Sequence, residues 1–211
     1  MKNYLRIIFS SLLLIWATPS QAEFNVGVGV IAGMVSSDGT ETEGTATDTS
    51  NRSKSFDEAF AGADIFAEFV SDGGYALGVS YVPINQEIGD GKRTDTGIND
   101  DDTGTRSASA ELVDMYSIYA NVPFGSEGWY GLLSYTEVTV ETTETLNVST
   151  YGNAEIDGYS VGLGKKSGPL KYELYYTDFD DINLTATTDA DSSNSIAADI
   201  DAVTFRISYG F

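Results

Sequence analysis

Apolar and polar residues alternate along most of the chain. Beyond Phe24, stretches of about ten residues with a period of two are separated by polar segments rich in Gly, Asp, Thr and Ser. This period is typical of β-strands whose two faces meet different surroundings. The pattern predicts eight strands, at residues 24–34, 60–70, 75–82, 111–122, 129–140, 159–165, 170–179 and 203–211. The alternation is less regular in the second, fourth and fifth strands. It places Asp114 on the same face as Leu112 and Ile118, where a carboxylate is tolerated only at a membrane rim.

The links between these strands alternate strictly in length. Outer-membrane barrels show this pattern, because their tight turns face the periplasm and their long loops face the outside. The sequence therefore predicts an all-β fold, a closed eight-stranded antiparallel up-and-down transmembrane β-barrel. The short links are 71–74, 123–128 and 166–169, and the long polar segments are 36–58, 85–108, 141–158 and 180–201.

The two faces of the predicted strands differ in composition. In the last strand, Val203 and Ile207 stand on one face, and Thr204 and Ser208 stand on the other. We expect the apolar face to point outward, because aromatic residues gather at strand ends, as in the girdles of membrane barrels. A soluble periplasmic ligand-binding barrel has the same alternation with the faces exchanged, and it is the alternative.

The first 22 residues have the features of a secretory signal peptide. Lys2 and Arg6 precede an apolar run at 7–17, and the small residues Ser20 and Ala22 occupy positions −3 and −1 of a cleavage site. The alternative is a membrane anchor, but the run is far shorter than the roughly 20 residues that cross a bilayer. We therefore expect a signal peptide at 1–22 and an outer-membrane β-barrel domain at 23–211.

Charge and composition exclude several kinds of partner and scaffold. Beyond residue 22 the chain keeps all 32 Asp and Glu but 9 of its 11 Lys and Arg, which gives a formal charge of −23. Such an acidic chain is not expected to bind nucleic acid, and the absence of Cys excludes a disulfide scaffold. No further segment is apolar enough for a transmembrane helix, so a closed barrel is the remaining way to span a membrane.

The last third of the chain resembles a known group of proteins. The stretch 203–211 is an alternating strand closed by an aromatic residue, and it resembles the C-terminal assembly signal of bacterial outer-membrane proteins. The stretches 158–164 and 172–179 are similar to strands of the opacity-protein and outer-membrane-protein-A transmembrane superfamily. The resemblance implies an eight-stranded fold, insertion by the barrel-assembly machinery and no enzymatic residues. The assembly signal would be carried by Phe205, Ile207, Tyr209 and Phe211.

Candidate catalytic chemistry is scarce. The chain has no His, whereas outer-membrane phospholipases, lipid A deacylases and omptin-type proteases resemble one another in using a His. We expect no enzyme, no catalytic residue and no cofactor, and a paired-carboxylate hydrolase is the formal alternative. The acidic stretch 100–102 and the pair Asp189 and Asp191 could hold Ca²⁺. Because neither has the spacing of a calcium loop, we expect solvated loops and no metal site.

A few charged residues fall on the predicted inner face. They are Arg206, Glu173, Glu68, Lys171 and Asp64, all toward the periplasmic side. Buried ions are costly unless they are paired, so we predict a network that fills the lower lumen. Arg206 is expected to pair with Glu173, and Glu68 is expected to reach across from the far wall. We interpret the network as a plug, and a gate for ions is the alternative.

These patterns predict a protein of the bacterial outer membrane with a structural or surface-interaction role. Its lumen would be filled by side chains, because an eight-stranded barrel is only wide enough for them, and its outer loops would be acidic. The alternative is a narrow porin-like channel for small or apolar solutes. We expect outer-membrane lipid and the assembly machinery as partners and a monomeric state, while the loop sequences indicate no particular partner.

Deletion of Phe211 should lower the amount of folded protein in the outer membrane and leave export across the inner membrane intact. The reason is that the resemblance assigns this aromatic residue to the assembly signal. Quantitative blots of fractionated membranes at limiting expression measure the effect. Unchanged outer-membrane levels would contradict the assignment.

Overall fold

The computed structural model describes residues 22–45, 48–83, 85–95, 104–145, 151–186 and 194–211. The predicted signal peptide, apart from Ala22, and the acidic stretches 100–102 and 189–191 lie outside these residues. The described residues contain no helix long and apolar enough to cross a membrane. They form the strands β1 (Glu23–Thr45), β2 (Asp48–Val70), β3 (Ala76–Val82), β4 (Gln86–Asp95), β5 (Gly104–Pro123), β6 (Trp129–Glu144), β7 (Ala154–Ser167), β8 (Leu170–Phe179), β9 (Ile182–Thr185) and β10 (Ser195–Gly210).

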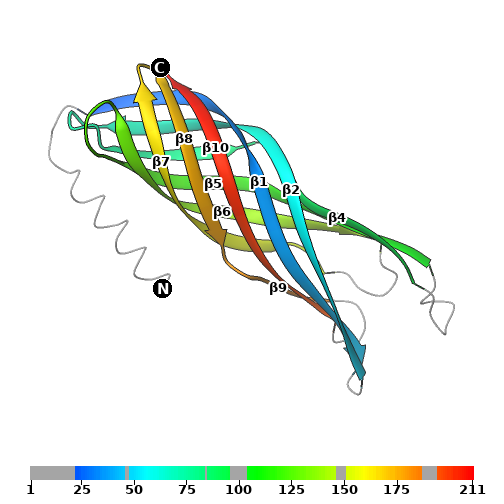
Figure 1. Cartoon of the computed structure of the whole chain (residues 1–211). Coiled ribbons are helices and arrows are strands. Elements are labelled where there is room, and N and C mark those ends of the chain that lie inside the picture. The colour runs from blue at the N-terminus through cyan, green and yellow to red at the C-terminus, as the bar shows by residue number, and fades with distance from the viewer. Residues whose placement is uncertain (1–21, 46–47, 84, 96–103, 146–150, 187–193) are drawn as a thin grey trace.

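Eight of the strands close into a ring. Their order is β1-β2-β3-β5-β6-β7-β8-β10, β10 pairs back onto β1, and all neighbours are antiparallel. Strand β4 follows β3 along β5, and β9 follows β8 along β10. Figure 1 shows the closed barrel, with the chain end marked C at one mouth and long hairpins beyond the other. The predicted eight-stranded antiparallel barrel is confirmed.

The strands run much further than the sequence pattern predicts. Strands β1 and β2 stay paired from Glu23 opposite Val70 to Thr45 opposite Asp48, and most of the four segments expected to be long loops is strand. That expectation was wrong because the period of two weakens where the outer face no longer carries apolar residues. The extensions are rich in Thr, a β-branched residue that favours strands. Cross-strand contacts such as the 2.9 Å hydrogen bond between the Thr40 and Ser53 hydroxyls support them.

The outer surface of the barrel carries a band of exposed apolar side chains. Val28 is 51% exposed, Leu163 is 57% exposed and Phe205 is 44% exposed, although all three stand on regular strands. The charged side chains at the same level point inward and are buried. A water-soluble barrel needs the reverse arrangement, so the band is a lipid-facing surface.

The apolar band ends at an acidic rim on the side of the long hairpins. Six strands carry a carboxylate as the next outward residue beyond the band. Just inside this rim, the rings of Tyr81 and Tyr116 stack at 4.6 Å. The Tyr135 hydroxyl donates to Asp157 Oδ1 at 2.9 Å. Tyrosines below carboxylates mark the level at which lipid gives way to polar surroundings. The rim carboxylates are Asp57, Asp114, Glu137, Asp157, Asp178 and Asp201.

Strand β5 changes its facing at Asp114. The pairing of β5 with β6 shifts between Val113 and Tyr116, and Asp114 has a φ of 51°. Because of this bulge, Leu112 lines the lumen while Ile118 lies in the outer band. The expectation that Asp114 shares a face with both was therefore wrong, since simple alternation does not survive a β-bulge. Asp114 is exposed at the rim, within 3.5 Å of the Tyr81 hydroxyl.

Inward-facing glycines stand opposite aromatic residues of the neighbouring strand. Gly78 is paired with Tyr119, and Gly164 is paired with Tyr130. A Cβ at Gly78 would lie 2.4 Å from the Tyr119 ring, and one at Gly164 would lie 2.3 Å from the Tyr130 ring. The glycines therefore give the rings room to lie across the wall, an arrangement that fills the narrow interior. Four more pairs follow the same rule: Gly27 with Phe66, Gly33 with Phe60, Gly158 with Phe179, and Gly162 with Tyr175.

A chain of residues 23–211, without the predicted signal peptide, should be insoluble in water and should refold only in detergent or lipid. The reason is the outward apolar band, which water does not solvate. The folded form should also migrate differently from the heated form on a gel. A monodisperse, detergent-free monomer in analytical ultracentrifugation would contradict the membrane-facing band.

Candidate functional site

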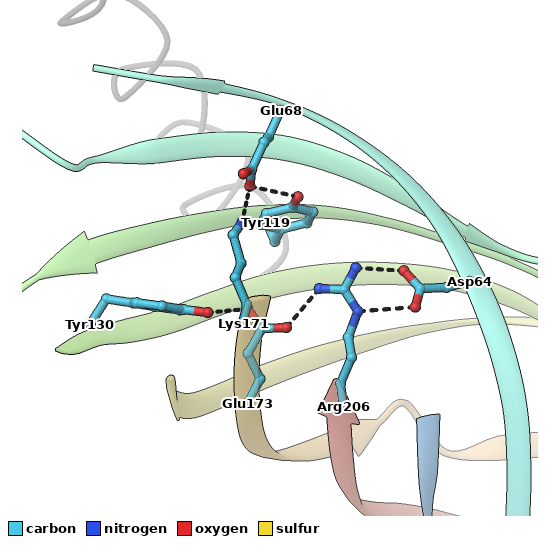
Figure 2. Close-up of polar contacts among 7 residues, drawn as sticks. All are labelled: Asp64, Glu68, Tyr119, Tyr130, Lys171, Glu173 and Arg206. Carbon is cyan, nitrogen blue, oxygen red and sulfur yellow. Dashed lines mark hydrogen bonds and ion pairs between the residues drawn. The ribbon is translucent and has the colours of Figure 1, made fainter. Parts of the chain in front are cut away.

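The lower lumen holds five charged side chains from three strands. Asp64 and Glu68 come from β2, Lys171 and Glu173 from β8, and Arg206 from β10. None is more than 6% exposed. Figure 2 shows them converging inside the barrel, with Arg206 between Asp64 and Glu173.

Arg206 joins three strands through its guanidinium group. Its Nε and Nη2 atoms donate to the two oxygens of Asp64 at 3.0 and 2.6 Å, and its Nη1 atom donates to Glu173 Oε2 at 2.6 Å. The planar fork of an arginine suits this double contact with one carboxylate and a further contact with another. The contact with Glu173 is local, since the two residues are opposite each other in the β8–β10 register. The contact with Asp64 spans β1, because β1 lies between β10 and β2.

Gly29 on β1 leaves the space for this second contact. A Cβ at Gly29 would lie 2.1 Å from Asp64 Oδ1 and 3.0 Å from Arg206 Nε. Any side chain there would therefore separate the two ions or displace them.

Lys171 forms the second centre of the network. Its ammonium donates to Glu68 Oε2, an ion pair between residues from different sides of the lumen. It also lies 5.3 Å from the centre of the Phe66 ring. The Arg206 guanidinium lies 4.8 Å from the same ring, so one aromatic residue contacts both cations.

Two tyrosines complete the network. Tyr119 donates its hydroxyl to Glu68 Oε2 at 3.0 Å, and Tyr130 donates to Glu173 Oε1 at 2.7 Å. The network holds three carboxylates and two cations, so one negative charge is in excess. The two hydroxyl donors stabilise that charge without adding another ion.

The structure brings together all five charged residues that the sequence singled out. The expected contact of Arg206 with Glu173 is present. Glu68 meets Lys171 rather than Arg206, and Asp64 occupies the other side of the guanidinium. The two carboxylates meet different cations because they lie at different levels along the barrel: Asp64 stands four residues from Glu68 on the same face of β2.

Sequence reasoning missed Tyr119 and Tyr130. Both belong to strands whose alternation is irregular, so the sequence does not determine whether these side chains face the lumen or the outside. The signal that could have found them is their pairing with Gly78 and Gly164, which requires the strand register. The four residues assigned to the assembly signal point outward. Phe211 and Val26 exchange backbone hydrogen bonds of 2.9 and 3.2 Å where the barrel closes. The role of the four signal residues in assembly stays a prediction.

Two groups of side chains interrupt the lumen: the charged network and, further out, a set of buried apolar residues. Toward the short turns, a pocket with about 100 Å³ of space is bounded by Glu68, Tyr130 and Lys171. Beyond the network, a cavity of about 70 Å³ reaches from Arg206 to Phe179. It is followed by a buried apolar collar, which we define as Val35, Ile88, Leu112, Val138, Val140, Ile156, Phe179, Ile182, Ile200 and Ala202.

Within the described ranges, no three or more His, Cys, Asp or Glu residues are grouped so as to hold a metal ion. The two acidic stretches considered for Ca²⁺ lie outside those ranges. Beyond the membrane band, a hydrogen bond with Asp181 raises the pKa of the exposed Asp199 carboxyl. The contact joins β10 to the residue before β9, and the two carboxyl groups oppose each other's ionisation.

No protein-family model and no curated protein matches the chain. Solved structures do match. The outer membrane protease OmpT from Escherichia coli superposes with a TM-score of 0.51 at 10% identity, over 90% of this chain and 98% of that one. The attachment invasion locus protein Ail of Yersinia pestis gives a TM-score of 0.37 at 12% identity, over 87% and 99% of the two chains. A FadL homologue of Pseudomonas aeruginosa gives 0.30 at 13% identity, over 91% and 65%.

At this level of identity the OmpT match shows the fold alone. The chain has the fold of bacterial outer-membrane β-barrels, as the sequence predicted. The outward apolar band puts this barrel in a membrane, in agreement with the predicted outer-membrane location.

Arg206→Ala should destabilise the barrel more than the triple change Arg206→Ala, Asp64→Asn, Glu173→Gln. The single change leaves two buried carboxylates without their cation, at a cost of roughly 3–5 kcal/mol in a dry site and less where water enters. The free energy of unfolding, measured by urea titration in lipid vesicles, tests this order. Lys166→Ala, at the exposed end of β7, serves as the control. If the triple variant loses the sum of the separate losses, the three side chains do not interact.

Proposed function

We propose that this chain is a structural and surface-interaction protein of the outer membrane, closed to ions and without catalytic activity. The apolar band anchors it in lipid. The extended strands present a polar surface to the outside. The observation that carries the proposal is the Arg206 contact with Asp64 and Glu173, which ties β2, β8 and β10 together through the lumen.

The closure has two independent parts. Ions meet the buried network first, where every charged group already has a partner of opposite charge. Beyond it they meet the apolar collar, in which Val35 and Val140 are each 1% exposed. An ion crossing the collar would lose its hydration without gaining a polar contact, and this is strongly unfavourable.

The outer part of the barrel is built for contact. The β1–β2 hairpin continues for residues 36–45 and 48–57 beyond the band, and every rung of it is paired. At about 3.4 Å per residue, this hairpin reaches roughly 30 Å from the rim. Figure 1 shows it and the β4–β5 hairpin projecting away from the barrel. Paired strands hold side chains in fixed positions, so the hairpin would lose less conformational entropy on binding a partner than flexible loops would.

Two features support the absence of catalytic activity. The chain has no His, and the buried carboxylates of the network are already engaged by cations and hydroxyls. A carboxylate that already accepts hydrogen bonds from a cation and a tyrosine is poorly placed to accept a proton from a substrate.

The second candidate function is a narrow channel for small or apolar solutes. The observation that favours it is the series of cavities along the lumen, of about 100, 70 and 420 Å³ from the turns to the outer mouth. The network and the collar separate these spaces. Passage would require both of them to rearrange.

The purified chain, reconstituted in planar bilayers, should show no unitary conductance steps in molar KCl. The physical reason is the double closure by the network and the collar. A general porin inserted in the same bilayer is the control for the assay. Steady unitary steps from the unmodified chain would overturn the proposal in favour of the channel.

A further inference from the structure

The barrel opens outward above the collar into a cup of about 420 Å³. Residues of β1, β2, β4, β5, β6, β9 and β10 line it. Its floor is apolar, formed by Ile88, Val140, Ile182 and Ile200, each at most 5% exposed. Water on this floor finds few hydrogen-bond partners, so the floor is suited to the apolar part of a ligand.

Cations are concentrated around this cup. Of the 11 Lys and Arg in the chain, Lys2 and Arg6 precede the barrel. Lys165 and Lys166 lie at the end of β7, and Lys171 and Arg206 lie in the lumen. The remaining five belong to the outer parts of β2, β4 and β5, in a chain with a formal charge of −21. Three of them, Arg52, Lys54 and Lys92, line the cup.

Lys54 is the cation best placed to meet a ligand. Its ammonium lies 4.0 Å from the centre of the Phe56 ring and donates to the backbone carbonyl of Asp90 at 3.5 Å. Both of these partners are neutral, so neither supplies a counter-charge to the ammonium. The side chain is exposed at the outer mouth.

The carboxylates of the cup limit the charge that it can accept. Glu41 Oε1 accepts a hydrogen bond from the Tyr151 hydroxyl at 3.2 Å. Glu41 also stands opposite Arg52 in the β1–β2 register. Asp90 also lines the cup. Three cations against two carboxylates leave one positive charge in excess. This balance suits a ligand with a single negative charge and opposes a polyanion.

We propose that the cup binds a single-chain anionic amphiphile of the fatty-acid class. The hydrocarbon chain lies on the apolar floor above the collar, and the carboxylate meets Lys54 and Lys92 at the mouth. The proposal rests on the proposed function, since it names the ligand of a surface-exposed site above a closed lumen. The collar makes the cup a binding site rather than an entrance.

The direct test is methyl NMR of the reconstituted full barrel in phosphatidylcholine nanodiscs, titrated with dodecanoate. The δ1 methyls of Ile88, Ile182 and Ile200 should shift and saturate. Those of Ile65 and Ile118, on the lipid-facing surface, should only follow the partition of dodecanoate into the bilayer. Lys54→Gln should weaken the saturating response about threefold to fivefold, the effect of one exposed charge pair. Lys166→Gln should leave it unchanged.

A second pair of variants tests the cup itself. Ala198 lines the cup, and Ala197 is exposed on the opposite face of β10. Ala198→Phe should fill the space and weaken dodecanoate binding at least tenfold, whereas Ala197→Phe should not. Dodecanol should bind the unmodified cup several-fold more weakly than dodecanoate, with no further loss in Lys54→Gln.

Three outcomes would overturn the proposal: no saturating shift of the cup methyls, equal binding of dodecanol and dodecanoate, or saturation by polyphosphate in place of dodecanoate. Conductance separates its failure from that of the proposed function. A barrel that stays closed to ions but ignores dodecanoate loses only its ligand, whereas a conducting barrel loses the proposed function.

Discussion

The constraint on which the rest of this structure depends is that charge inside a narrow barrel must be neutralised by the barrel itself. An eight-stranded wall leaves an interior that side chains fill, and Asp64, Glu68 and Glu173 are each at most 2% exposed there. Two cations pair with these three carboxylates, and two tyrosine hydroxyls donate hydrogen bonds to Glu68 and Glu173. Because Arg206 contacts β2 and β8 at once, the same neutralisation that makes burial tolerable also ties the wall of the barrel together.

The inner glycines follow from that constraint. The rings of Tyr119 and Tyr130 must lie flat along the wall to place their hydroxyls on carboxylates, and only a residue without Cβ opposite each ring permits it. Gly29 has the corresponding role for the Asp64 contact. The small residues of the inner face thus leave the space that the network occupies. The apolar residues of the outer face contact lipid.

Much of this arrangement could be predicted from the sequence, because in a membrane barrel the two faces of a strand meet such different surroundings. The alternation of Val203, Phe205 and Ile207 with Thr204 and Arg206 gives the strand and its two faces, and the aromatic residues at strand ends indicate which face points outward. The outer extensions could not be predicted in the same way, since β1 beyond Ser36 is polar on both faces and its pairing with β2 is visible only in the register. The bulge at Asp114 hid the facing of β5, and with it Tyr119. The pairing of Lys171 with Glu68 depends on heights across the lumen that a linear pattern does not contain.

The central claim is that the Arg206 guanidinium is buried and fully engaged inside the folded barrel. The exchange of its Nε proton with water, measured by NMR in nanodiscs, tests this claim most directly. The Arg206 Nε proton, which is donated to Asp64 inside the barrel, should exchange orders of magnitude more slowly than the Nε proton of Arg52, whose side chain is exposed at the outer mouth. Equal exchange rates for the two arginines would contradict the account, because they would show that water reaches the network as freely as it reaches the surface.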